Sequence, residues 1–354
     1  MRTVGVEEEF LLVDDVGAPV GLAQEAAGGG VQLELKEEML ETGTDPCLTL
    51  AELDADVRKQ RRAAALAAES AGARLAALAT SPLPVTSNVT AAFRYRRIAA
   101  EYGLTAREQL TCGCHVHVQV ADDEEGVAVL DRIGPWLPVL LAMSANSPFW
   151  NGVDSGYASY RSQVWQRWPT AGPTGTFGSA AAYQQVIDDL VASGSALDRA
   201  MIYFDARLSE RYPTVEIRVA DVCLRAEDTV LIGALTRALV ETAAREAADG
   251  VGLPEVRPEV RPEVLRGAGW RAGRAGLRGP LVHPVRLTQV PAGEAVGALI
   301  DHVRPVLAET GEESTVSAAW QRLLTRGSGA EEQRFWAVDG VAAVVAGAVE
   351  ATIA

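Results

Sequence analysis

The sequence contains very little lysine. Lys36 and Lys59 are the only lysines among 32 basic residues in a chain of 354, so nearly every positive charge is an arginine. Acidic residues number 47, and the formal net charge is −15. A chain this acidic is unsuited to binding nucleic acid or an anionic membrane through its general charge. We expect neither as a partner, and an anionic substrate would have to meet arginines or a metal ion placed locally.

Cysteine and long apolar runs are scarce as well. The four cysteines, Cys47, Cys112, Cys114 and Cys223, form no C-x-x-C pair, and a chain of this size does not need disulfides, so reduced thiols are expected. No apolar run reaches membrane length without a break, and no basic segment followed by an apolar one opens the chain. These features predict a soluble, cytoplasmic protein.

Two glycine motifs that bind phosphate groups are missing. The sequence has neither the G-x-G-x-x-G of dinucleotide-binding folds nor the G-x-x-x-x-G-K-[ST] of P-loop enzymes. A nucleotide enzyme of the Rossmann or P-loop class is therefore not expected.

The hydrophobic pattern predicts widely spaced strands among helices. Strands are expected at 3–14, near 31–35 and 39–45, at 110–122 and, as a hairpin, within 201–221. Helices are expected at 49–80, 91–103, 125–145, 181–194 and 227–249, and through most of 265–354. A loop is expected at 146–179, and the tandem repeat at 254–264 suggests an extended, exposed connector. This order favours an α+β fold with an antiparallel sheet backed by helices, in one domain over 1–354 whose sheet lies within 1–250.

The first predicted strand carries three consecutive acids, in "VGVEEEF" (residues 4–10). Because side chains alternate along a strand, Glu7 and Glu9 share one face and Glu8 points to the other. Two carboxylates on one face suit a hard divalent cation, which prefers oxygen ligands. Surface acids on a solvated edge strand would give the same pattern, so both interpretations stay open.

Three further segments place polar side chains on predicted strands. In "CGCHVHVQV", His115 and His117 share one face, opposite Cys112 and Cys114, so a mixed His and Cys zinc site is disfavoured and the cysteines are expected in the core. In "TVEIRVAD", Glu216 and Arg218 share a face, as a metal and phosphate site or an ion pair would require. Asp205 and Arg207 repeat this pattern, and Glu34 and Glu41 lie among apolar residues without a spacing that decides whether they converge.

Five segments together resemble the glutamate–cysteine ligase type 2, or carboxylate–amine ligase, family. They are "VGVEEEFLLVD", "TCGCHVHV", "SANSPFWNGVDSGYASYRS", "PTVEIRVADV" and "RGSGAEEQR". The resemblance implies a glutamine synthetase-like fold, a funnel-like curved antiparallel sheet with helices outside, which binds ATP and Mg²⁺ or Mn²⁺. It also implies formation of an amide through an acyl phosphate, with L-glutamate as the expected acid and cysteine or another amine as the acceptor.

The resemblance implies roles for individual residues as well. The implied metal ligands are Glu7, Glu9, Glu34, Glu41, His115 and Glu216. Arg218 would stabilise the transferring phosphoryl group beside Glu216, and Gln333 and Arg334 would lie near the nucleotide. The implied substrate-pocket residues are Ser147, Tyr157, Arg161 and Arg207. Small-molecule acid and amine substrates are the expected partners, and a homodimer is the expected assembly.

Two alternatives differ from the ligase in class. A metal-dependent amide hydrolase would use His115 and His117, but only His283 and His302 remain to complete its metal site. A non-catalytic member of the fold would bind ligands without turnover, although the intact acids and Arg218 argue against it. Dependence of activity on ATP separates the ligase from both.

Overall fold

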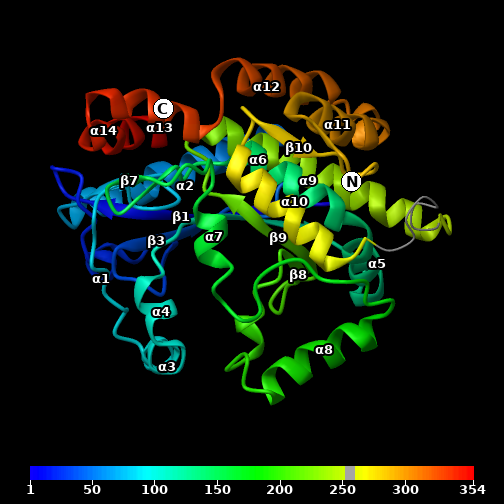
Figure 1. Ribbon diagram of the computed structural model, residues 1–354, viewed down its shortest axis with the longest axis horizontal. Helices are drawn as coiled ribbons and strands as arrows, with labels where there is room; N and C mark the ends of the chain where they lie inside the picture. Colours follow the sequence, from blue (N-terminus) through cyan, green and yellow to red (C-terminus); the bar gives the residue numbers. More distant parts are fainter. Residues whose placement is uncertain (252–259) are drawn as a thin grey trace.

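A single antiparallel sheet forms the centre of the computed structural model, which describes residues 1–251 and 260–354 (Figure 1). Its strands run in the order β2–β3–β1–β5–β9–β8, and β4 pairs with β1 off this path. Their bounds are Val4–Val13 (β1), Val31–Leu33 (β2), Met39–Gly43 (β3), Arg74–Ala76 (β4), Gly113–Gln119 (β5), Ala206–Leu208 (β8) and Thr214–Asp221 (β9). All pairings in this sheet are antiparallel, which confirms the predicted α+β fold.

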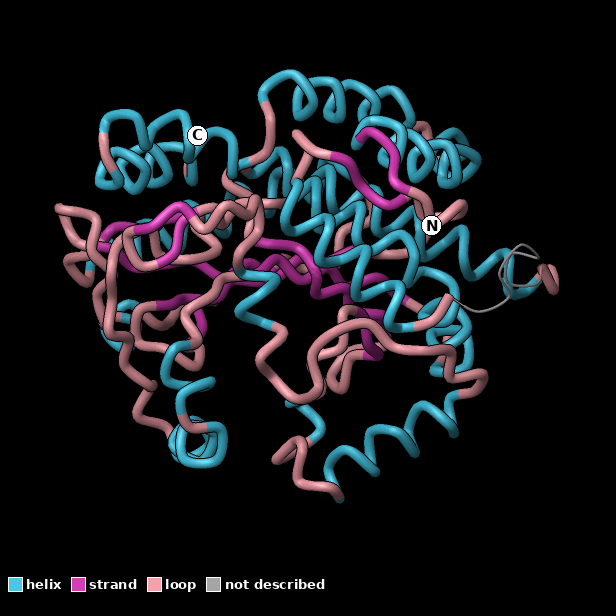
Figure 2. The backbone as a smooth tube through the Cα atoms, viewed as in Figure 1, coloured by secondary structure: helices cyan, strands magenta, loops and turns pink. Residues whose placement is uncertain are grey.

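Helices lie on both sides of this sheet. In the view of Figure 1, α9 and α11 to α14 lie above the strands, whereas α3, α4 and α8 lie below them, and Figure 2 shows the strands as a band between these groups. The helices are α1 Ala23–Ala26, α2 Leu50–Ser70, α3 Phe93–Tyr102, α4 Leu104–Glu108, α5 Asp123–Ile133, α6 Leu137–Ser144, α7 Arg161–Trp165, α8 Ala180–Ala192, α9 Ala226–Ala248, α10 Pro262–Ala275, α11 Ala292–Glu309, α12 Glu313–Arg326, α13 Gly329–Trp336 and α14 Val341–Thr352. Two short hairpins complete the list, β6 Phe149–Trp150 with β7 Val153–Asp154, and β10 Pro280–Val282 with β11 Gln289–Pro291.

The face of β1 opposite Glu7 and Glu9 carries apolar side chains and Glu8. Val4 and Val6 belong to the same core cluster as Leu53 of α2 and Leu235 of α9, so this face packs under helices. Glu8 lies on the same face and is 3% exposed. It is neutralised by Arg61 of α2, whose Nη2 and Nε lie 2.6 and 2.9 Å from its carboxylate oxygens. Glu8 is therefore a buried structural charge.

The predicted helix at 49–80 is too long. It starts as expected, because Thr49 and Glu52 form a reciprocal capping box, but it ends at Ser70. Gly72 follows with φ +82°, and residues 74–76 form β4, which pairs with β1. The alanine-rich composition does not change across this break, so the helix end is marked by Gly72 and by the pairing of 74–76 with β1.

The helix predicted at 125–145 consists of two helices. A 3₁₀ turn at Gly134–Trp136 separates α5 from α6. The combined segment Asp123–Ser144 is long and apolar enough to cross a membrane, but 67% of its most apolar window is buried inside the protein. It is the core helix pair of this fold.

Two predicted loops contain more structure than expected. The segment 146–179 includes the β6–β7 hairpin and α7. The tandem repeat at 254–264 falls mostly outside the described residues, and its last three residues, 262–264, begin α10 instead of continuing an extended connector. The pyrrolidine ring of Pro262 explains this start, because it fixes φ at a helical value in the first turn.

Candidate active site

Neighbouring strands bring the predicted acids and histidines together. In the antiparallel register, Glu9 of β1 is opposite Glu41 of β3, and Glu7 is opposite His115 of β5. On the next strand pair, His117 is opposite Glu216 of β9. The cysteines of β5 point the other way: Cys114 is fully buried in the core with Val116 and Val118, as the alternation predicted.

These side chains line a cavity of about 240 Å³. All six predicted metal ligands contribute to its wall, together with Arg207, Arg218 and His117. The other walls come from α3, the residue after α4, the end of α7 with the segment after it, and the segments on either side of β8. They include Arg94, Tyr95, Gln109, Trp165, Trp168, Tyr203, Arg211 and Tyr212. The β2–β3 hairpin brings Glu34 and Glu41, seven residues apart in the sequence, to the same cavity. Their spacing alone did not decide whether they converge.

Two groups of three side chains are close enough to hold a metal ion. Ligand atoms of Glu7, His115 and Glu216 lie within 4.8 Å of one another, and so do those of Glu9, Glu41 and His115. His115 belongs to both groups and is 3% exposed. Carboxylate oxygens with one imidazole nitrogen are a donor set for Mg²⁺ or Mn²⁺.

The pKa values in this cavity show strong like-charge repulsion. Burial, followed by the nearby carboxylate of Glu34, raises the pKa of Glu9 to about 7 against the opposing charge of Arg161. Burial, followed by Glu34 and Glu7, also raises the pKa of Glu41 well above its ordinary value. Carboxyl groups held this close cannot all ionise unless a cation joins them.

Histidines and arginines compensate other acids of the cavity. Burial raises the pKa of Glu7, but contacts with His115 and His117 outweigh it and lower the pKa well below its usual range. Burial and the charge of Arg218 lower the pKa of His115 to about 4, so this imidazole is neutral and able to ligate a metal.

Glu216 is clamped between two arginines. The Nε of Arg207 donates to it at 2.7 Å, and Arg218 donates from the same strand. Burial opposes ionisation of Glu216, yet Arg218 and Arg207 lower its pKa far below the ordinary value. The pairing of β5 with β9 shifts register between Cys114 and Val116, opposite the part of β9 that holds Arg218.

Several buried polar atoms of the cavity wall have no hydrogen-bond partner in the described structure. They are Nε2 of His115 and of His117, Nε of Arg218, Oε1 of Gln109 and Nε1 of Trp168. Leaving a buried polar group unpaired costs roughly 1–3 kcal/mol, so proteins rarely accumulate them without a ligand or water to bind. Together with the repelling carboxylates, these atoms fit a site built for a metal ion and polar substrates.

Five predicted residues do not line this cavity in the described part of the chain. Ser147 and Arg161 belong to a buried network around Asp221: the Ser147 hydroxyl donates to Asp221 at 2.7 Å, and Arg161 Nη1 lies 3.9 Å from the same carboxylate. Gln333 donates from its amide to Asn146 at 2.6 and 2.8 Å.

The remaining two of the five lie near the surface. Arg334 pairs with Asp154 at 2.8 Å, and the Tyr157 hydroxyl accepts a hydrogen bond from the Trp270 indole at 3.2 Å. In the described structure these side chains contact other parts of the chain, although Nε of Arg161 is buried without a hydrogen-bond partner and the charge of Arg161 lowers the pKa of Glu9. The substrate and nucleotide roles of the five residues therefore stay predictions.

The aromatic wall was missed by sequence reasoning. Trp165 and Trp168 fall in the segment predicted as loop, and Tyr203 precedes β8. The Trp165 and Tyr203 rings lie 5.0 Å apart, and Arg218 lies over both, at 5.7 and 5.9 Å. The richness of 146–179 in tryptophan and tyrosine was the available signal.

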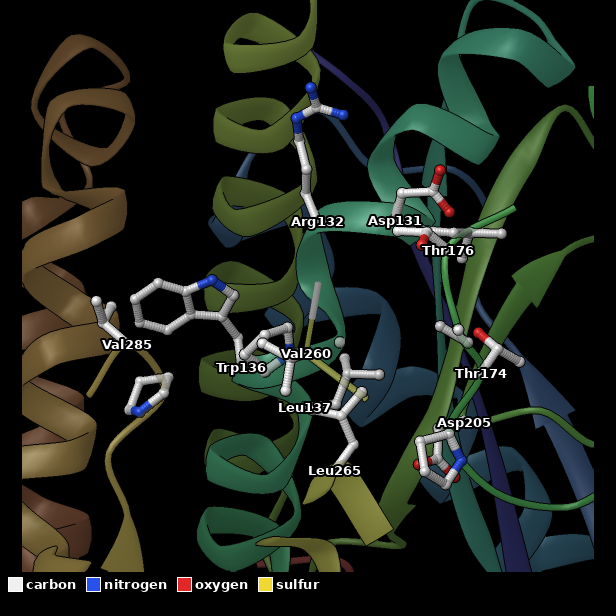
Figure 3. Close-up of a pocket in the computed structure, with 17 residues that line it drawn as sticks. Asp131, Arg132, Trp136, Leu137, Thr174, Thr176, Asp205, Val260, Leu265 and Val285 are labelled. Atoms are coloured by element: carbon white, nitrogen blue, oxygen red, sulfur yellow. The ribbon is translucent and has the colours of Figure 1, made fainter. Parts of the chain in front are cut away.

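A second, smaller cavity of about 80 Å³ lies away from this chemistry (Figure 3). Its walls are mostly apolar and come from α5, α6, α10 and the 173–176 loop. Of Asp205 and Arg207, which strand alternation places on one face, Asp205 lines this cavity and Arg207 lines the larger one. Asp205 therefore separates from Arg207, its partner in that pattern. None of the predicted metal ligands lines this cavity among the described residues.

Comparisons with known proteins agree with the geometry. The model of glutamate–cysteine ligase family 2 matches residues 3–345. The chain belongs to glutamate–cysteine ligase family 2. It is 52% identical to "Putative glutamate–cysteine ligase 2-2" of Frankia alni, over 94% of this chain and 92% of that protein. It is also 52% identical to "Putative glutamate–cysteine ligase 2-1" of Streptomyces avermitilis, over 94% of each chain.

Solved structures share the fold at low sequence identity. The glutamate–cysteine ligase of Francisella tularensis in complex with AMP superposes with a TM-score of 0.71 at 12% identity, covering 99% of this chain and 88% of that one. The bifunctional glutathione synthetase of Pasteurella multocida gives 0.69 at 14% identity, covering 99% of this chain and 52% of that one. The family 2 fold is thus that of these ligases.

Proposed function

We propose that this protein is an ATP-dependent carboxylate–amine ligase. It joins the γ-carboxyl group of L-glutamate to cysteine or another amine through an acyl phosphate. The observation that carries the proposal is the cavity in which Glu7, Glu9, Glu41, Glu216 and His115 face Arg218, in a chain of glutamate–cysteine ligase family 2.

The proposed cofactors are ATP and Mg²⁺ or Mn²⁺. The cation would be held by Glu7, His115 and Glu216 and by Glu9, Glu41 and His115, with Glu34 beside them. When bound, such ions neutralise phosphate charge and orient the phosphoryl group for transfer. ATP use is supported by the family and by the fold shared with a ligase solved in complex with AMP.

The reaction needs two anions to approach each other. A γ-carboxylate oxygen attacks the γ-phosphorus of ATP, the bond to the bridging oxygen breaks, and ADP leaves. The amine nitrogen then attacks the acyl carbon, phosphate leaves with the bonding electrons, and the nitrogen loses a proton. A carboxylate alone has no adequate leaving group, so the phosphoryl transfer supplies one.

Arginines of this chain would lower the barrier to that approach. Arg218 is 7% exposed and keeps its positive charge because Glu216 outweighs the effect of burial, raising its pKa. A guanidinium in such a dry site stabilises the charge on a transferring phosphoryl group strongly. Arg207 holds Glu216 from the other side, and the aromatic rings of Trp165 and Tyr203 fix the position of Arg218.

The hydrolase alternative is not favoured. His302 stacks on Trp136 with ring centroids 4.3 Å apart, and His283 accepts hydrogen bonds within its own turn. Neither lines the cavity in the part of the chain that the structure describes. A cytoplasmic location, small-molecule substrates and a homodimer belong to the proposal as predictions.

The test is release of ADP by the purified protein with MgATP, L-glutamate and a panel of amines that includes cysteine, with mass detection of products. Amine-dependent ADP release together with the corresponding amide mass supports the ligase and names its acceptor. Amide hydrolysis without ATP would contradict it.

A further inference from the structure

Thr214 and His117 form a hydrogen bond beside the acid cluster. Thr214 is the first residue of β9, and its Oγ1 lies 2.9 Å from Nδ1 of His117 on β5. The Thr214 hydroxyl has no other hydrogen bond among the described residues. Tyr212 packs edge-on against the same imidazole, with ring centroids 5.9 Å apart. The ring of His117 is therefore fixed from one side by a hydroxyl and from another by an aromatic ring.

The other nitrogen of His117 faces Glu7. Its Nε2 lies 3.4 Å from Oε2 of Glu7 and is buried without a hydrogen-bond partner. Glu7 also lies 3.7 Å from Nδ1 of His115. The Glu7 carboxylate belongs to one of the two candidate cation groups, whereas His117 belongs to neither. His117 is thus placed to orient Glu7 as a metal ligand rather than to bind the metal itself.

The chemistry of imidazole determines which atom donates in each contact of His117. A neutral histidine has one nitrogen that donates and one that accepts. An ionised carboxylate only accepts, so the nitrogen that faces Glu7 must be the one that carries the proton. In the neutral ring Nδ1 then accepts, and the Thr214 hydroxyl donates to it. A threonine at this position selects one tautomer of His117.

We infer that Thr214 is a positioning residue for the metal site, acting through His117 on Glu7; this rests on the proposed function. Replacing a side chain that orients a metal ligand typically costs about 10–100-fold in metal affinity or activity. The Thr214 hydroxyl keeps the N–H of His117 directed at Glu7, and Glu7 is thereby held in the rotamer that meets His115 and Glu216. Loss of the hydroxyl leaves the imidazole free to turn.

Two substitutions at Thr214 separate this role from packing. Thr214→Val keeps the shape and removes the hydroxyl, whereas Thr214→Ser keeps the hydroxyl and removes a methyl group. Thr236→Val is the matched control, because Thr236 is fully buried on α9 and its hydroxyl has no hydrogen-bond partner among the described residues. Mn²⁺ binding to each purified variant is measured by loss of the free-ion electron paramagnetic resonance signal, and Mg²⁺ activation is measured by amide formation.

The expected result is a selective loss of metal affinity. Thr214→Val should raise the Mn²⁺ dissociation constant and the half-activating Mg²⁺ concentration by about tenfold or more, with kcat at saturating metal within about threefold of the unsubstituted protein. Thr214→Ser and Thr236→Val should bind Mn²⁺ as the unsubstituted protein does.

Other results would overturn the inference. Unchanged Mn²⁺ binding in Thr214→Val, or equal losses in Thr214→Val and Thr214→Ser, would show that the hydroxyl positions nothing, while the ligase itself would stand if amide still forms. An unsubstituted protein that binds no Mn²⁺ and forms no amide would refute both proposals. One that forms amide without binding Mn²⁺ would refute only the role of Thr214.

Discussion

Glu8 and Arg61 form an ion pair, 3% and 1% exposed, on the helix side of the strand whose other face carries Glu7 and Glu9. Arg61 also donates to the backbone carbonyls of Cys223, Leu224 and Thr352, and Thr229 donates to Glu8. One guanidinium thus ties α2, β1, the start of α9 and the C-terminal helix together behind the candidate active site.

Removing one partner of this pair should destabilise the protein. Arg61→Met leaves the Glu8 carboxylate buried and unpaired, which typically costs about 3–5 kcal/mol in the free energy of unfolding. Arg58→Met is the control, because Arg58 pairs on the same helix with Asp54, the two side chains being 31% and 43% exposed, and such a solvent-accessible pair is worth about 0–1 kcal/mol. Urea unfolding followed by circular dichroism measures both. Equal losses in the two variants would contradict this account of the buried pair.

Glu9→Gln should abolish turnover without unfolding the protein. The amide keeps the shape of the side chain but removes a charge that the proposed cation needs, so amide formation should fall by more than about 100-fold. Thermal stability without metal should be kept or rise, because burial already disfavours the ionised carboxylate. Glu101→Gln, at an exposed position on α3, is the control. Normal turnover in Glu9→Gln would rule out the assignment of Glu9 as a metal ligand.

The stability of the metal-free protein should fall as the pH rises through neutrality. The pKa of Glu9 is raised to about 7 in the folded state, so the folded protein binds more protons than the unfolded one between about pH 4.5 and 7. Stability from this group is present at low pH and is lost through that window. Asp205, with its pKa raised to about 7 by burial, and Glu41 act in the same direction.

His115 acts in the opposite direction over part of this range. Its pKa is lowered to about 4, so its contribution increases between about pH 4 and 6.5 and is constant above that. The decline should therefore be unopposed only from about pH 6.5, and it should level off by about pH 8 as Glu9 and Asp205 finish ionising. Urea unfolding in EDTA across that range measures it, and added Mg²⁺ or the Glu9→Gln substitution should reduce the slope. A stability that rises with pH from 6.5 to 8 in EDTA would refute the assignment.

Gly113 should tolerate no side chain. An added Cβ would lie 2.3 Å from Nη2 of Arg161 and 3.0 Å from Nε2 of His115. Gly113→Ala should displace both groups and cost about 1–3 kcal/mol in stability, with a loss of amide formation of at least about tenfold. Gly267→Ala on α10 is the control, because nothing lies within 4 Å of its added Cβ and alanine favours a helix interior by about 0.5–1 kcal/mol. Full activity in Gly113→Ala would show that the position of His115 is not critical.

The sequence alone determined which side chains share a face of each strand. Alternation separated Glu7 and Glu9 from Glu8, and His115 and His117 from the cysteines, because the side-chain period of a strand is two wherever it pairs. Local chemistry also predicted the start of α2, since a capping box involves only residues three apart. The antiparallel α+β fold followed from the resemblance and from the order of the elements.

Only the tertiary structure decided which of these residues meet. Strand order places β1 between β3 and β5, and that order brings Glu41 and His115 to Glu9; nothing in the local sequence encodes it. The same applies to Ser147 and Arg161, expected in the substrate pocket, and to Gln333, expected near the nucleotide. Only the tertiary structure shows their contacts with Asp221 and Asn146, and their roles stay predictions. Sequence pattern determines on which face of its own strand a side chain lies, whereas long-range strand pairing determines which residues it contacts.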